Sequence, residues 1–154
     1  MPQEFFMRPA MCPNPGSSIA ANQRAHCELF NPAASGYLVK DITVWISKST
    51  GFCVLGKGAP MLDNASFPDS RGLTIIDGAP RQYSAAHART KLTTAPAEVI
   101  QGGQWVTHDG VTGLIELRFP DMVIGMGTGL MIRSNKDGEP LMVSFKWRED
   151  VFGA

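Results

Sequence analysis

The amino-acid sequence predicts an all-β protein, an antiparallel β-sandwich that is jelly-roll-like and carries an extended N-terminal arm. Three observations support this fold class. Apolar and polar residues alternate with a period of two in several segments, and Gly (16) and Pro (11) are frequent enough to supply many turns. No segment shows a convincing helical periodicity. At 154 residues the chain fits one domain, which we place at residues 22–154, after an arm at residues 1–21.

The arm is expected because its prolines disfavour regular secondary structure while its apolar residues favour burial. Its four prolines argue against a regular helix or a central strand. Its apolar side chains nevertheless favour burial, which is unusual for a disordered tail. Two alternatives follow: the arm docks on a neighbouring molecule, or it packs on its own domain. The residues expected to make the contact are Phe5, Phe6, Met7 and Met11.

The clearest alternation lies near the end of the sequence. At residues 141–148, Leu, Val, Phe and Trp alternate with Met, Ser, Lys and Arg, as in a strand buried on one face. Leu130 and Ile132 show the same alternation, and residues 135–138, Asn-Lys-Asp-Gly, supply turn chemistry between the two runs. The sequence therefore predicts an antiparallel hairpin over residues 129–148, with the aromatic residues of its second strand in the core.

Further strands are expected from shorter alternating or apolar runs. Residues 82–90 also fit a helix, but small residues at every second position favour a strand. Residues 59–80 are rich in Pro and Gly and are expected to form a long irregular loop, interrupted by the apolar run at 73–76. The remaining strands are expected at residues 42–46, 52–55, 115–119 and 122–124.

Trp45 is the aromatic residue that we expect outside the core. The apolar stripe of the strand at residues 42–46 occupies its even positions, whereas Trp45 shares the opposite face with Asp41 and Ser47. An exposed Trp on a sheet face is typical of a contact surface for protein or glycan. The alternative is a second buried layer over this face.

The sequence offers no recognisable catalytic or metal-binding motif. Residues 125–129, Gly-Met-Gly-Thr-Gly, would cradle a phosphate only ahead of a helix, and a strand pattern follows instead, which favours a turn. The three His and three Cys lack the spacings of metal ligands or of a disulfide framework, and no G-x-S-x-G motif is present. We therefore expect no cofactor, no metal and no enzymatic activity.

Charge patterning argues against two classes of partner. The 14 basic side chains balance the 14 acidic ones without a basic cluster, so nucleic-acid binding is not expected. The uncharged stretch at residues 9–23 contains prolines and polar residues, unlike a membrane span or a signal peptide, so we expect a cytosol-like site of synthesis. Only 18% of residues are charged, and this deficit favours self-association.

Two passages resemble small all-β virion structural proteins of tailed bacteriophages. The first is Phe-Asn-Pro-Ala-Ala-Ser-Gly at residues 30–36, leading into the strand at 39–44. The second is Gly-Thr-Gly-Leu-Met-Ile-Arg-Ser at residues 127–134, leading into Leu-Met-Val-Ser-Phe-Lys-Trp-Arg-Glu at 141–149. In that group, NP-x-x-SG precedes an alternating strand, and a GxGL-x-(V/I)RS … L-x-V-x-F-x-W-x-E hairpin closes the chain.

The resemblance implies a capsid decoration or cement protein. Such a protein binds the major capsid protein and itself, with a trimer favoured, and stabilises the phage head from the capsid surface after synthesis in the host cytoplasm. A component of the phage tail or its fibres is the alternative from the same resemblance. A carbohydrate-binding module that uses Trp45 is the alternative from the residues themselves.

Overall fold

The computed structural model describes residues 3–12, 19–48, 53–58, 70–74, 83–93, 104–108, 113–134 and 137–153. Within these ranges the fold is all-β and every strand pairing is antiparallel, as expected. The strands are β1 (Gln3–Cys12), β2 (Arg24–Asn31), β3 (Tyr37–Lys48), β4 (Cys53–Gly58), β5 (Ser70–Thr74), β6 (Tyr83–Thr93), β7 (Gln104–His108), β8 (Gly113–Phe119), β9 (Thr128–Ser134) and β10 (Leu141–Val151).

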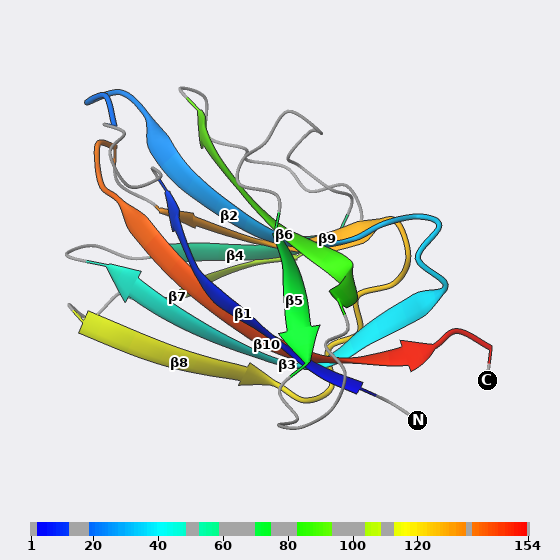
Figure 1. Ribbon diagram of the computed structural model, residues 1–154. Helices are drawn as coiled ribbons and strands as arrows, with labels where there is room; N and C mark the ends of the chain where they lie inside the picture. The colour runs from blue at the N-terminus through cyan, green and yellow to red at the C-terminus, as the bar shows by residue number, and fades with distance from the viewer. Residues whose placement is uncertain are drawn as a thin grey trace.

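The strands in the described part of the chain form one continuous ladder in the order β7-β4-β9-β2-β6-β5-β1-β10-β3-β8. We call β7, β4, β9, β2 and β6 the β2 layer, and β1, β10, β3 and β8 the β10 layer. β5 pairs with β6 on one side and with β1 on the other, so it joins the two layers. Figure 1 shows β2, β9 and β4 in the upper part of the molecule and β10, β3 and β8 in the lower part.

Apolar side chains from both layers share one core. Phe145 and Trp147 of β10 are 0% and 1% exposed, which confirms their expected burial. Burying side chains of this size contributes roughly 1.5–3 kcal/mol each before conformational entropy is subtracted. The cluster consists of Ala25, Cys27, Leu29, Val39, Ile42, Val44, Ile46, Leu55, Ala86, Ala88, Ile124, Leu130, Ile132, Leu141, Val143, Phe145 and Trp147.

The segment that also fitted a helix is a strand, β6, as favoured from its sequence. Its buried face is made of small residues: Ser84, Ala86, Ala88 and Thr90 are all at most 1% exposed. This face carries the period of two that the sequence showed. Within the expected loop at residues 59–80 the structure describes only β5, at Ser70–Thr74. This strand overlaps the expected apolar interruption at 73–74, but it begins three residues earlier, so residues 70–72 are strand and not loop.

The expected hairpin over residues 129–148 is wrong. β9 pairs with β2 and β4, whereas β10 pairs with β1 and β3, so the two strands belong to different layers. The turn chemistry is present but connects layers: Gly138 has a φ of 74° and donates from its backbone N to the carbonyl oxygen of Gln23, at 2.7 Å. Alternation identified the buried face of each strand, but it could not identify the strand with which it pairs.

The expected N-terminal arm is not confirmed, because β1 lies inside the sheet, between β10 and β5. Prolines did not prevent this pairing. Pro9 falls at the register shift between Met7 and Ala10, and a bulge is one of the few places where a strand tolerates proline. The other prolines of residues 1–21 lie outside Gln3–Cys12. Docking of this segment on another molecule stays a prediction.

A corner at Asn31 carries the chain from the β2 layer to the β10 layer. Asn31 is fully buried, and its Nδ2 donates to the carbonyl oxygens of Tyr37, at 2.9 Å, and Ile124, at 3.1 Å. Its own carbonyl oxygen accepts a bond from the backbone N of Gly127, at 2.8 Å. Gly127 has a φ of 77°, and Thr128 donates back to the carbonyl of Gly125, which confirms the turn expected at residues 125–129.

Gly129→Ala should lower the free energy of unfolding by about 1–3 kcal/mol. A Cβ at this position would lie 3.1 Å from the carbonyl oxygen of Leu29 and 3.2 Å from Cγ and Cδ of buried Glu28. Gly125→Ala is the matched control, because its Cβ would meet nothing within 4 Å. Chemical denaturation measures both, and equal unfolding free energies for the two variants would contradict this account of the packing.

Candidate interaction surface

The expected contact residues of β1 pair through their backbone with β10. The register pairs Phe5 with Trp147 and Met7 with Phe145, whose side chains lie in the core. The same register pairs Phe6 with Lys146 and Met11 with Met142, whose side chains are half-buried. The β1 residues therefore fall at positions that alternate between the two faces of the β10 layer.

Trp45 lies on the face of β3 opposite the core, as its sequence position predicts. Ile42, Val44 and Ile46 are at most 1% exposed, whereas Trp45 is half-buried. The register places it between Ser144 of β10 and Glu116 of β8. By register, Trp45, Phe6 and Met11 thus lie on the same outer side of the β10 layer, with β10 between β3 and β1.

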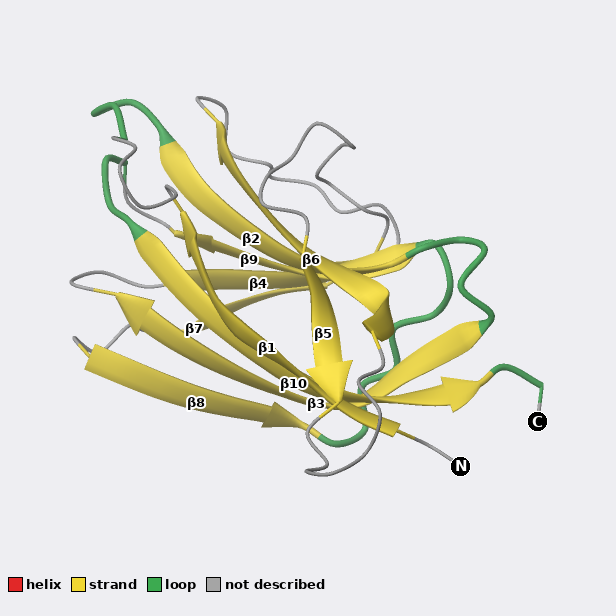
Figure 2. Ribbon diagram, viewed as in Figure 1, coloured by secondary structure: helices red, strands yellow, loops and turns green. Residues whose placement is uncertain are grey.

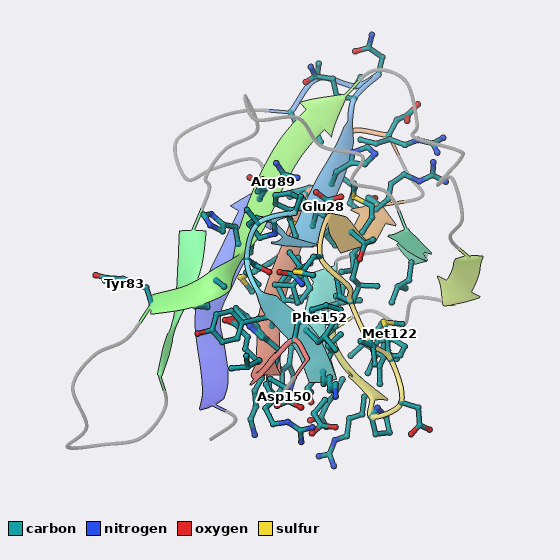
Figure 3. All side chains as sticks on the ribbon, turned by 90° about the vertical axis from the view of Figure 1, so that its right-hand side faces the viewer. Glu28, Tyr83, Arg89, Met122, Asp150 and Phe152 are labelled. Carbon is teal, nitrogen blue, oxygen red and sulfur yellow. The ribbon has the colours of Figure 1, made fainter. Side chains whose placement is uncertain are left out.

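An exposed apolar patch, which sequence analysis missed, lies at one end of the sandwich. Tyr37 (38% exposed) pairs with Val151 (54%), and the next residue, Phe152 (59%), donates from its backbone N to the carbonyl of Gly36, at 2.9 Å. Val123 (36%) precedes Ile124, which bridges to Val39 of β3. We call Tyr37, Val123, Val151 and Phe152 the end patch. Figure 3 shows Phe152 and Met122 in the same region, well away from exposed Tyr83.

A charged network adjoins the end patch. Arg148 donates from Nε to Asp150, at 3.0 Å, and from Nη1 to Asp41, while Nζ of Lys40 lies 3.2 Å from the other oxygen of Asp150. Asp41 has a φ of 49° and sits where the register of β3 and β10 shifts. The hydrogen bond from Arg148 lowers the pKa of Asp150, and the same bond raises the pKa of Arg148. An apolar patch beside fixed charges is typical of a protein contact.

A second polar cluster lies on the outer face of the β2 layer. Glu28 and Arg89 oppose each other on β2 and β6 and form an ion pair of 2.7 Å, with side chains 1% and 4% exposed. The guanidinium of Arg89 also stacks over Phe30, 4.0 Å from the ring centroid. Figure 3 shows the two charged side chains next to each other. A buried pair of this kind contributes little net stability, although loss of one partner is costly.

Glu149 connects the two layers through a polar contact. Its carboxylate accepts bonds from the backbone N of Ala85, at 2.6 Å, and of Ala86, at 3.4 Å. These amides lie on β6 beyond His87, the last β6 residue that pairs with β2. The carboxylate of β10 thus takes the place of a neighbouring strand, which satisfies backbone donors that would otherwise be costly to bury.

The described residues were compared with what a metal site and a membrane-spanning helix require. No group of three or more His, Cys, Asp or Glu side chains among them is arranged to hold a metal ion. The same part of the chain contains no helix of the length and hydropathy that a membrane crossing needs.

Comparison of the sequence and fold with protein-family models, curated proteins and solved structures finds no match.

Asp150→Asn should lower the free energy of unfolding by about 1 kcal/mol at neutral pH, because it removes the carboxylate that pairs with both Arg148 and Lys40. The pKa of Asp150 lies below its ordinary value of 3.8, so its contribution is present above that pH and is lost as the pH falls further. Urea denaturation at a series of pH values should show the two proteins converging in acid. Asp121→Asn controls for loss of one exposed carboxylate. If Asp150→Asn were less stable than the wild type by the same amount at every pH, the contribution assigned to ionised Asp150 would be contradicted.

Arg89→Met should destabilise the fold by about 3–5 kcal/mol, because it removes a buried cation that forms an ion pair with the buried carboxylate of Glu28. Adding Glu28→Gln to Arg89→Met removes both charges and should restore part of the loss, which a double-mutant cycle in denaturant measures. Arg118→Met is the matched control, because its ion pair with Glu116 is exposed. A double variant less stable than Arg89→Met would contradict this account.

Proposed function

We propose that this chain is a non-enzymatic virion structural protein of a tailed bacteriophage, a capsid decoration or cement protein that binds the major capsid protein and itself. The observation that carries the proposal is the end patch. Four apolar side chains are 36–59% exposed, and the pairings of Tyr37, Phe152 and the residue after Val123 place them at one end of the β sandwich. Contiguous exposed apolar surface on a small domain marks a site of association.

The physical demands of such a role fit a small sandwich. A decoration protein acts by mass action: each copy binds only the assembled shell, and many weak contacts together stabilise it. Its task is to remain folded and to present one surface. The end patch supplies apolar area for that surface, and the Lys40, Asp41, Arg148 and Asp150 network supplies charges that orient the contact.

The topology and the motifs add support. Successive strands lie in different layers at β1–β2, β2–β3, β3–β4, β7–β8, β8–β9 and β9–β10. Such crossings are also a feature of jelly-roll domains, which are frequent in viral capsid proteins. We therefore keep a jelly-roll-like sandwich as the proposed finer fold. The NP-x-x-SG passage that carries the resemblance forms the Asn31 corner, where its polar residues have specific structural partners.

The composition of purified particles tests the proposal. Quantitative mass spectrometry of intact phage particles should find the chain in a copy number that is a large, symmetric fraction of the major capsid protein. Absence from the particle would overturn the proposal. A few copies that fractionate with tails would favour the tail or fibre alternative instead, and glycan binding abolished by Trp45→Ala would favour the carbohydrate-binding alternative.

Phe152→Asp should weaken binding to capsids at least tenfold, because it places a charge in the end patch, and central aromatic residues commonly contribute 2 kcal/mol or more, on the order of a tenfold change or larger. The readout is sedimentation of the purified chain with capsids that lack it. Tyr83→Asp is the matched control: Tyr83 is also exposed and aromatic, at 64%, but lies away from the patch. Equal binding by the two variants would exclude the end patch as the docking surface.

A further inference from the structure

β8 is an edge of the ladder formed by the described strands. It pairs with β3 over seven residues, from Gly113 to Phe119, and it ends the strand order. Figure 1 shows it as the outermost strand of the lower part of the molecule, and Figure 2 shows the same strand without a neighbour on its outer side. Its register against β3 is continuous, with no bulge to twist the edge away. A regular edge of this kind presents backbone donors and acceptors that can pair with another strand.

The side chains of β8 are suited to a second strand of the same sequence. Glu116 and Arg118 are exposed on the outer face, at 42% and 73%, and form a weak ion pair of 3.3 Å within one strand. Ile115, Leu117 and Phe119 occupy the core-facing positions but are only half-buried. A strand added beside β8 would widen the β10 layer and place its own side chains next to these three apolar side chains.

We propose that β8 pairs antiparallel with β8 of a second copy of this chain, around a two-fold axis at Leu117. In an antiparallel pair, directly opposed residues lie on the same face, so a two-fold axis must pass between a residue and its own copy. With Leu117 at the axis, Glu116 lies opposite Arg118 of the second copy, and Arg118 lies opposite its Glu116. Ile115 then lies opposite Phe119 of the second copy.

Charge complementarity selects this register. An axis at Glu116 or at Arg118 would place two like charges directly opposite each other, which disfavours pairing. An axis at Ile115 would place Glu116 opposite Leu114 and leave Arg118 beyond the end of the strand. The Leu117 register is the one in which both charges of each copy meet an opposite charge and the apolar residues meet one another.

The contact is a two-fold interface and does not rest on the proposed virion function. It predicts a reversible dimer, in contrast to the trimer expected from the resemblance, and it uses an edge of the β10 layer rather than the end patch. Because one strand pair buries little surface, the dimer should form in a concentration-dependent way. A continuous sheet that runs through both copies would be its structural signature.

Charge inversion tests the pairing on the full chain. Sedimentation velocity over a range of concentrations should show wild-type dimers, whereas Glu116→Arg and Arg118→Glu should each associate about tenfold or more weakly, because like charges then oppose each other. An equimolar mixture of the two variants should dimerise again, because each strand then meets the opposite charges of the other. Asp121→Arg, which changes net charge as Glu116→Arg does, is the matched control and should behave as the wild type.

Three results would overturn the inference: wild-type chain that stays monomeric or forms trimers, single variants that associate as the wild type does, or a mixture that associates no better than its components. Hydrogen exchange of the wild-type chain gives a readout that needs no variant. Backbone amides within residues 115–119 should become more protected as the concentration rises, while those of β2 keep constant protection. Unchanged exchange in β8 would also exclude the pairing.

Discussion

The corner at Asn31 is the contact on which the two-layer arrangement depends. One buried amide holds the end of β2, the start of β3 and the segment at Ile124 at a single point. Without it, two carbonyl oxygens in the corner would lose their donor, at a cost of roughly 1–3 kcal/mol for each buried group left unpaired. The crossing from the β2 layer to the β10 layer, and therefore the core between them, begins at this residue.

The sequence predicted which face of a strand is buried better than it predicted which strands pair. β3, β6 and β10 showed their buried face through alternation, and the structure confirms those faces, including the outward position of Trp45. β2 gave no comparable signal, because Ala25, Cys27 and Leu29 are buried in the core while His26 and Glu28 are buried on the opposite face. A strand buried on both faces does not alternate.

Strand order and the candidate surface depend on contacts distant in sequence, so alternation could not supply them. The Asn-Lys-Asp-Gly segment fits a hairpin and an interlayer corner equally well, and Gly138 serves the corner by bonding to Gln23. In the end patch, Val151 is exposed although it continues the β10 pattern, because it pairs with Tyr37, the first residue of β3. Four prolines made residues 1–21 resemble an arm, yet Pro9 falls at the one irregularity in the pairing of β1 with β10.

The pairing of β1 with β10 has a consequence for the order in which the protein folds. Gln3 lies opposite Glu149, so the β1–β10 ladder of the β10 layer joins the first described strand to the last. Closing so long a loop costs entropy before any contact is gained, which slows folding. β2, β6, β4 and β9 can associate as they leave the ribosome, whereas β1 must wait for β10 to be synthesised. During that interval β5 can pair with β1 only at Phe5 and Phe6, so most of this apolar strand lacks its partner, and a chaperone or another copy of the chain can capture it.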